Sequence, residues 1–420
     1  MNEKIKSTAD EIIRKGRVAS RDLLKLSEED CNQALQKLAT LLEQRTESIV
    51  AENQKDLYSG KTNGLSEALL DRLALNPLRI SAIAEGVRAV ISLRAPLGEE
   101  LSYYESPKGI TVKRVRVPLG LICIIFESRP NVTIETAILA LKSRNAIILK
   151  GGKEAKHSNA IFASLIHEAL RSVQLNADAV QLLGDDGRQI VSEIIQKEDG
   201  VDLVIPRGGE SLIRAISAQS RVPVLKHYKG VCHVYVDDKA DLCKALPIVV
   251  NAKCQRPSVC NAMETLLVHS AIAETFLPKV GEALLAKGVE IRGDNLTRAL
   301  IPDALTASEE DWKEEYLSLT LAIKVVESLD EAIAHVNRYG SRHTEAILSE
   351  NEEALHRFAT EVDAGSVMLN TSTRFADGFE YGLGAELGIS TDKLHARGPM
   401  GLEGLTTYKW ITSSDGAIRE

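Results

Sequence analysis

Short, wholly apolar segments alternate with amphipathic segments through the middle of the chain. The apolar segments are Leu121–Phe126, Ala146–Leu149, Val180–Leu183, Leu203–Ile205 and Val222–Leu225. The segments between them repeat apolar residues at helical spacing, namely in Ile134–Leu141, Ile161–Ala169, Ile190–Ile195 and Leu212–Ile216. Apolar strands separated by helices are typical of a parallel sheet that is buried on both faces. We therefore predict an α/β block of the nucleotide-binding type, although it lacks the GxGxxG fingerprint.

A second α/β block follows the first. Its strand candidates are His233–Val236, Thr265–Val268, Ile323–Val326, Glu345–Leu348 and Ser366–Leu369. Helices are predicted between them, among them Ile272–Leu285 and Glu352–Thr360. The chain is therefore expected to hold two parallel-sheet domains.

The first hundred residues are predicted to be helical. Ser27 and Asp30 have the spacing of a capping box, and the apolar positions that follow keep to one helical face. A second helical stretch runs from about Leu69 to Leu93, and Pro77 is expected to divide it into two helices.

A ribbon of two strands is predicted between Leu101 and Val117, with its turn at Ser106–Gly109. The pair Lys113-Arg114 interrupts the alternation of apolar residues, which favours a bulge there. A terminal strand is predicted over Leu405–Thr412.

Composition narrows the class of protein. At roughly 150 residues per domain, 420 residues indicate two or three domains. The net charge of −8 and an aromatic content of 4% argue against a nucleic-acid partner. The longest apolar run, Leu119–Phe126, is too short to cross a membrane, and the charged N-terminus has no signal-peptide core. We expect a cytoplasmic protein without a membrane partner.

The six cysteines form no CxxC pair and the histidines form no HExxH motif, so neither a metal site nor a disulfide framework is predicted. Cys260 stands between a polar, proline-containing loop and an apolar strand, a junction where reactive groups are common. Burial as a small hydrophobic residue is the competing interpretation. Cys254, at a predicted helix end, competes as the nucleophile.

Polar and glycine-rich motifs follow successive predicted strands. Asn131 lies in the segment after the first strand, where its amide is suited to an oxyanion, although a turn-and-cap role is equally consistent with the sequence. Lys150, Gly151, Gly152 and Lys153 follow the next strand and suit a phosphate, with a solvated loop as the alternative. Gly208, Gly209, Glu210 and Ser211 follow another strand and open a helix, whose N–H groups favour a pyrophosphate.

These motifs resemble those of the aldehyde dehydrogenase superfamily over essentially the whole chain. The matching segments are FESRPNVT (126–133), KGGKEA (150–155), CHVYVD (232–237), QRPSVCNAMETLLVH (255–269), EEYL (314–317), RFADGFEYGLGAELGIST (374–391) and KLHARGPMGLEGLTTYKW (393–410). Within the superfamily, they are most similar to a branch that reduces an acyl phosphate.

The resemblance implies a cofactor-binding domain of residues 1–100 and 121–228 and a catalytic domain of residues 229–399. Residues 101–120 and 400–420 would form a small β element for oligomerisation, with the ribbon paired to the C-terminal strand. The implied reaction is the NADPH-dependent reduction of γ-glutamyl 5-phosphate to glutamate 5-semialdehyde and phosphate, the second step of proline biosynthesis.

The resemblance also assigns roles to residues. Cys260 corresponds to the nucleophile, Asn131 to the amide that donates to the oxyanion, and Glu315 to the glutamate that binds the nicotinamide ribose. Lys153 stands where many NAD-preferring members have a glutamate, which favours NADP(H). Hydrolytic members carry a general base in a Glu-Leu-Gly-Gly segment, and the corresponding stretch here, His227-Tyr-Lys-Gly230, has no carboxylate.

Chemistry rather than a motif suggests Arg256 and Arg374 for the phosphate and carboxylate of the substrate, since a guanidinium suits either group. Salt bridges are their competing interpretation. A homo-oligomer is expected, and a separate glutamate 5-kinase is a candidate partner. The rival functions are an NAD-dependent aldehyde oxidation that ends in hydrolysis and a catalytically silent scaffold.

Overall fold

The structure is a computed structural model, and it describes residues 2–184, 186–226 and 228–419. The chain divides into two compact units, which we describe separately. Unit 1 contains residues 1–226, 382–388 and 400–420, and unit 2 contains residues 227–381 and 389–399. Residues 382–388 thus pack with unit 1, although they lie inside the segment expected to form the catalytic domain.

Helices form the first part of unit 1. They are α1 (Asn2–Leu23), α2 (Glu28–Gln44), α3 (Thr46–Thr62), α4 (Glu67–Leu73) and α5 (Pro77–Ser92). The capping box is confirmed: the Asp30 N–H donates to Ser27 Oγ over 3.1 Å, and the Ser27 N–H donates to the Asp30 carboxylate over 2.8 Å. The division at Pro77 is also confirmed, because this proline starts α5 behind the N-cap Asn76.

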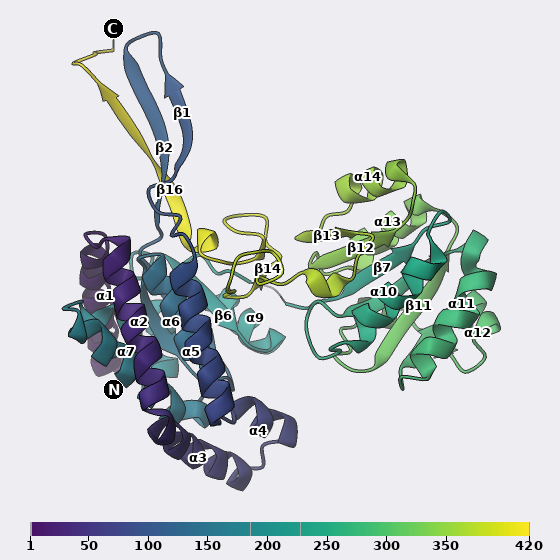
Figure 1. Ribbon diagram of the computed structural model, residues 1–420, viewed down its shortest axis with the longest axis horizontal. Helices are drawn as coiled ribbons and strands as arrows, with labels where there is room; N and C mark the ends of the chain where they lie inside the picture. Colours follow the sequence, from purple (N-terminus) through teal and green to yellow (C-terminus); the bar gives the residue numbers. More distant parts are fainter. Residues whose placement is uncertain (1, 185, 227, 420) are drawn as a thin grey trace. The chain divides into compact units, whose positions relative to one another are not determined.

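A parallel sheet forms the core of unit 1 (Figure 1). Its strands are β3 (Leu121–Phe126), β4 (Ala146–Lys150), β5 (Val180–Leu182) and β6 (Leu203–Arg207), in the order β5-β4-β3-β6. The helices that alternate with them are α6 (Asn131–Lys142), α7 (Lys156–Ser172), α8 (Gly187–Ile194) and α9 (Glu210–Gln219). All residues of β3 are buried, as expected for a strand covered on both faces.

The strand order creates a switch point beside β3. The chain adds β4 and β5 on one side of β3 and then places β6 on the other side. The loops that leave β3 and β6 therefore run in opposite directions, and a crevice forms between them at the carboxyl ends of the strands. This is where ligands of open α/β sheets usually bind.

The strand predicted at Val222–Leu225 is wrong as a full strand. Only an isolated bridge joins Val224 to Val204, supported by backbone bonds from Val204 to Pro223 and from Leu225 to Val204. Pro223 has no N–H to donate, so the segment cannot continue a ladder.

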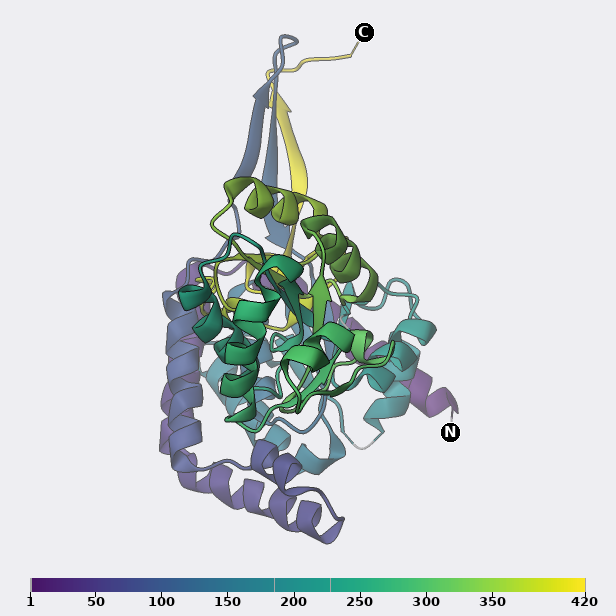
Figure 2. The same ribbon diagram turned by 90° about the vertical axis from the view of Figure 1, so that its right-hand side faces the viewer.

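A separate antiparallel sheet extends away from the helices of unit 1 (Figures 1 and 2). Its strands are β1 (Glu100–Glu105), β2 (Ile110–Pro118) and β16 (Thr406–Ser414), in the order β1-β2-β16. The predicted ribbon and its pairing with the C-terminal strand are confirmed. The irregularity opposite Arg114 is present, but the extra residue is Leu101 on the partner strand.

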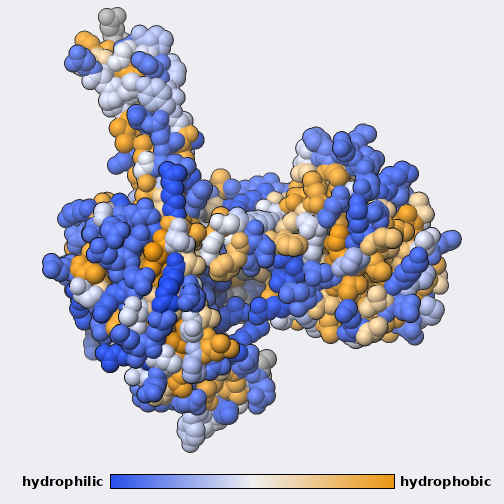
Figure 3. Space-filling model, in the orientation of Figure 1, coloured by the Kyte–Doolittle hydropathy of each residue, from blue (hydrophilic) through white to orange (hydrophobic). Residues whose placement is uncertain are grey.

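This three-stranded sheet exposes large apolar and aromatic side chains. Hydrophobic patches are visible along it in the surface view (Figure 3). Exposed side chains on its strands are Tyr103, Tyr104, Tyr408, Trp410 and Ile411. A small sheet with such a surface has the composition of an interaction element.

Unit 2 is built on a parallel sheet in the order β10-β9-β11-β8-β7-β12-β13. The strands are β7 (Cys232–Val236), β8 (Met263–His269), β9 (Glu290–Gly293), β10 (Leu305–Thr306), β11 (Thr320–Val326), β12 (Thr344–Leu348) and β13 (Ser366–Leu369). The helices are α10 (Leu242–Cys254), α11 (Ser270–Leu285), α12 (Asn295–Leu300), α13 (Leu329–Tyr339) and α14 (Glu352–Glu361). The short strands β9 and β10 were not predicted. A hairpin of β14 (Ile389–Ser390) and β15 (Gly398–Pro399) forms a further small sheet.

Alternate residues of the unit 2 strands supply two apolar cores. Val234 and Leu266 pack into the core formed with α10 and α11. Their neighbours Tyr235 and Leu267 face the other way and pack with Phe358 of α14. Both faces are therefore covered, and the two parallel-sheet domains expected from the sequence are confirmed.

Among the described residues, no helix combines the length and the apolar character that a membrane crossing would need.

Candidate active site

A cleft of about 980 Å³ opens at the carboxyl ends of β3 and β4 in unit 1, beside α8 and α9. Four of the residues expected to bind cofactor line it: Lys150, Gly152, Lys153 and Ser211. Phe126, Glu127 and Ser128 of the loop after β3 also line the cleft. The cleft therefore occupies the switch-point crevice that the strand order creates.

Cationic side chains gather in this cleft. Lys150 is half-buried, and burial lowers the pKa of its ammonium group, an effect that Glu154 opposes and that Arg188 and Lys153 reinforce. The Lys150 ammonium donates to the carbonyl oxygen of Gly151. Arg188, near the start of α8, lines the same cleft and was missed from the sequence, because no motif marked that helix.

Carboxylates hold the backbone around the cleft. Glu154 accepts hydrogen bonds from the Ser128 N–H over 2.6 Å and from Ser128 Oγ over 2.8 Å. Ser128 has a left-handed backbone with φ of 45°, and these two bonds stabilise it. Glu127 accepts from the Gly209 N–H over 3.3 Å, at the start of α9.

The remaining cofactor-binding candidates of unit 1 are not among the residues that line the cleft: Gly151, Gly208, Gly209 and Glu210. A Cβ on Gly208 would lie 2.4 Å from Glu127 Oε2, so this glycine permits the carboxylate to approach α9. The Glu210 carboxylate pairs with Arg214 one turn later. The volume, the lysines and the arginine of the cleft nevertheless fit a phosphate-bearing dinucleotide.

Asn131 is the first residue of α6 in unit 1. Its Nδ2 donates to Glu135 Oε1 over 2.7 Å. The amide orientation is thus set by a carboxylate one turn later on the same helix.

Cys260 of unit 2 lies in the loop between α10 and β8 and is partly exposed. Its carbonyl oxygen accepts from the buried Cys232 thiol over 3.2 Å. A Cβ on Gly230 would lie only 1.9 Å from the same carbonyl oxygen, so only glycine allows the two backbones to approach this closely. Cys254 ends α10, and burial raises the pKa of its thiol, which makes it a poorer nucleophile.

Both candidate arginines lie near Cys260 within unit 2. Arg374 Nε donates to Gln255 Oε1 over 2.8 Å, and Gln255 precedes Arg256. Burial lowers the pKa of Arg374, and the positive charge of Arg256 lowers it further. Asn261 Nδ2 donates to the carbonyl oxygen of Ala376 over 2.9 Å, which ties the Arg374 segment to the residue after Cys260.

Glu315 belongs to the same edge of unit 2. Its Oε1 accepts from the Gly230 N–H over 2.8 Å. Of the segment 227–230, His227 lies outside the described residues, while Lys229 pairs with Glu314 over 3.3 Å. The segments of Gly230, Cys260 and Glu315 precede β7, β8 and β11, so the amino ends of three parallel strands gather them.

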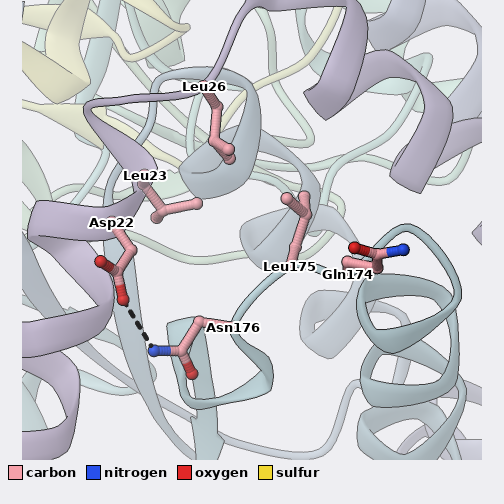
Figure 4. Close-up of a pocket in the computed structure, with 6 residues that line it drawn as sticks. All are labelled: Asp22, Leu23, Leu26, Gln174, Leu175 and Asn176. Atoms are coloured by element: carbon pink, nitrogen blue, oxygen red, sulfur yellow. Dashed lines mark hydrogen bonds between the residues drawn. The ribbon is translucent and has the colours of Figure 1, made fainter.

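A second, smaller cavity of about 240 Å³ lies between the end of α1 and the segment after α7 (Figure 4). Its leucines are Leu23, Leu26 and Leu175, and Asn176 donates to Asp22 over 3.2 Å beside them. None of the residues singled out in the sequence lines this cavity.

Comparison with known families assigns the class of protein. The profile of the aldehyde dehydrogenase family matches residues 1–294 and 283–411. The chain belongs to this family, and its fold of two parallel-sheet units with a separate antiparallel sheet is the family's fold.

The individual relatives are more specific. A gamma-glutamyl phosphate reductase from Carboxydothermus hydrogenoformans is 52% identical over 408 residues, which cover 97% of this chain and 98% of that protein. The crystal structure of a gamma-glutamyl phosphate reductase from Thermotoga maritima is 45% identical with a TM-score of 0.96 and covers 98% of this chain and 100% of that one. The enzyme of that name from Saccharomyces cerevisiae is 31% identical with a TM-score of 0.54, covering 98% of each chain.

The contact between Gly230 and Cys260 yields a prediction. Gly230→Ala places a methyl group against the Cys260 carbonyl oxygen, and the loop must shift to admit it. With Cys260 as the nucleophile proposed below, a displacement of about 1 Å costs up to about a hundredfold in rate, so kcat should fall by as much as about that factor. Steady-state kinetics measure this loss.

Gly86→Ala is the matched control, since nothing lies within 4 Å of a Cβ at this helical position. Its activity should equal that of the parent. Unchanged kcat in Gly230→Ala would show that the close backbone approach does not position the cysteine.

Proposed function

We propose that this chain catalyses the NADPH-dependent reduction of γ-glutamyl 5-phosphate to glutamate 5-semialdehyde and phosphate, the second step of proline biosynthesis. The observation that carries the proposal is the grouping of the Cys260 loop with Arg256 and Arg374 in unit 2. A substrate with a carboxylate and a phosphate suits two guanidinium groups beside a nucleophile. The likeness to a gamma-glutamyl phosphate reductase over 97% of the chain supports the same assignment.

Cys260 acts as the nucleophile in this proposal. Its thiolate attacks the acyl carbon, the bond from that carbon to the phosphate oxygen breaks, and phosphate leaves with the electron pair. By resemblance to the family, the side-chain amide of Asn131 would donate to the oxyanion that develops on the acyl oxygen. After the thioester has been reduced, the carbon–sulfur bond breaks, the thiolate is regenerated and the aldehyde is released.

The unit 1 cleft is the proposed place for the cofactor. A reduced nicotinamide bound there would supply the hydride that the thioester requires. Lys150 and Lys153 would bind phosphate groups, with Lys153 directed to the 2′-phosphate that distinguishes NADPH from NADH. Glu315 would bind the nicotinamide ribose through its carboxylate.

The wider assignments follow from the same resemblance. Unit 1 would serve as the cofactor-binding domain and unit 2 as the catalytic domain. The sheet β1-β2-β16 would join copies of the chain into a homo-oligomer through its exposed aromatic residues. A separate glutamate 5-kinase is a partner that would supply the labile acyl phosphate. A reducing compartment such as the cytoplasm suits a reaction that needs a free thiol.

The reaction run in reverse tests the proposed function. Because the segment 227–230 has no carboxylate to activate water, the thioester should wait for phosphate. We expect NADP⁺ reduction with glutamate 5-semialdehyde to require phosphate or arsenate. Robust production of glutamate without phosphate would instead favour a hydrolytic aldehyde dehydrogenase, and no turnover at all would favour a silent scaffold.

Replacement of the two competing cysteines tests the nucleophile. Cys260→Ala should abolish turnover and leave NADPH affinity nearly unchanged, because the thiol acts only in the covalent step. Cys254→Ala is the matched control and should retain most of the activity. Turnover assays and fluorescence titration with NADPH measure both quantities, and exchanged phenotypes would assign the nucleophile to Cys254.

Charge reversal at Lys153 tests the cofactor preference. Two unit charges about 4 Å apart at an effective dielectric constant near 20 interact by roughly 4 kcal/mol before desolvation. A third of that value is about a tenfold preference. Lys153→Glu should therefore reduce the ratio of kcat/KM for NADPH to that for NADH by at least about tenfold. A parental ratio would place recognition of the 2′-phosphate at Lys150 or Arg207.

A further inference from the structure

A buried ion pair closes the loop that carries Cys260. Lys253 lies in the last turn of α10, and Glu264 is the second residue of β8, so the two residues stand on either side of the loop. Lys253 Nζ lies 2.5 Å from Glu264 Oε2, and both side chains are 0% exposed. The pair therefore joins the two ends of the segment from which Cys260 projects.

The other oxygen of Glu264 binds a second functional segment. Glu264 Oε1 accepts from the Leu317 N–H over 3.2 Å, two residues after Glu315. Leu317 has a left-handed backbone with φ of 53°, and its side chain is exposed. Because the Leu317 side chain is exposed, its packing does little to hold the left-handed backbone. The hydrogen bond to Glu264 therefore anchors this conformation.

Lys253 also contacts Tyr316, the residue between Glu315 and Leu317. Its ammonium nitrogen lies 5.8 Å from the centre of the Tyr316 ring. The Tyr316 hydroxyl donates to Asp311 Oδ1 over 2.8 Å, so the ring is held from its other end. Lys253 and Glu264 together contact both residues that follow Glu315.

Glu315 completes a path back to the nucleophile. Its carboxylate accepts from the Gly230 N–H, and the Gly230 backbone abuts the Cys260 carbonyl oxygen. The Cys260 loop and the Glu315 segment are therefore connected in two ways, through Gly230 and through the buried pair.

Stability alone does not account for this pair. Burial raises the pKa of Glu264 to about 7 against the opposing charge of Lys253, and burial lowers the pKa of Lys253. Apolar residues of similar volume usually replace a buried ion pair without loss of stability. In some proteins a buried pair serves instead to specify one conformation, and the position of this pair at both ends of the Cys260 loop suits that role.

We propose that Lys253 and Glu264 are positioning residues that hold the Cys260 loop and the Glu315 segment in one fixed arrangement. This inference rests on the proposed function, in which Cys260 is the nucleophile and Glu315 binds the nicotinamide ribose. Each of the two hydrogen bonds that Glu264 accepts thus has a separate effect. The bond from Lys253 to Glu264 governs the rate of the covalent step, and the bond from Leu317 to Glu264 governs cofactor affinity.

Two double variants separate these consequences. Lys253→Met/Glu264→Leu removes both bonds with an apolar pair, whereas Lys253→Met/Glu264→Gln removes the ion pair and keeps an acceptor for the Leu317 N–H. We expect the first variant to lower kcat and weaken NADPH binding, each by about tenfold. The second should lower kcat by about tenfold but keep the Kd for NADPH within about threefold of the parent.

For each double variant of the full chain, we would measure the melting temperature, kcat by steady-state assay, and the Kd for NADPH by fluorescence titration. Glu331→Gln is the matched control, since Glu331 also binds a lysine, Lys324, over 2.8 Å and a backbone N–H, that of Glu327, over 2.9 Å. It should leave kcat and Kd unchanged. Parental kcat in either double variant that melts near the parental temperature overturns the inference, and the glutamine variant decides if the leucine variant does not fold.

Glu315→Gln distinguishes this inference from the proposed function. If it leaves the Kd for NADPH unchanged, the role proposed for Glu315 is wrong, and kcat of the double variants alone decides the inference. If Glu315→Gln weakens binding while Lys253→Met/Glu264→Leu binds NADPH as the parent does, the cofactor role stands and the positioning role is wrong.

Discussion

The close approach of two backbones, at Gly230 and Cys260, is the constraint on which the edge of unit 2 that carries Cys260 depends. A side chain at residue 230 would occupy the position of the Cys260 carbonyl oxygen. With glycine there, the loop before β8 packs directly on the segment before β7, and the Gly230 N–H remains directed at Glu315. Three segments that are distant in the sequence thus meet at Gly230, through one backbone contact and one bond to a carboxylate.

The two units place their candidate groups at opposite ends of their parallel strands. In unit 1, the cleft lies at the carboxyl ends of β3 and β4, where the strand order reverses. In unit 2, the loop of Cys260 and the segments of Gly230 and Glu315 precede their strands. A search limited to carboxyl strand ends would therefore find the residues proposed to bind the cofactor and overlook Cys260, the proposed nucleophile.

Charge is used differently in the two units. The cleft of unit 1 carries lysines and an arginine near carboxylates that hold backbone N–H groups, an arrangement suited to an anionic ligand. Unit 2 buries the ion pair Lys253–Glu264 at the two ends of the Cys260 loop and leaves Arg256 exposed, with Arg374 near it. In the proposed site, the buried pair positions the backbone and the two arginines bind the substrate.

The sequence by itself determined the architecture, because apolar strands and amphipathic helices have different periods that are legible without any contact. Strands β3 and β4, the capping box at Ser27 and the break at Pro77 follow from local rules. Resemblance of motifs, rather than spacing, selected Cys260 over Cys254. Only the tertiary structure decided which distant residues meet. It places Arg188 in the cleft, bonds the Glu127 carboxylate to the Gly209 N–H before α9, and pairs Lys253 with Glu264 across the Cys260 loop. A buried charge and an exposed charge are the same letters in a sequence, and only packing distinguishes them.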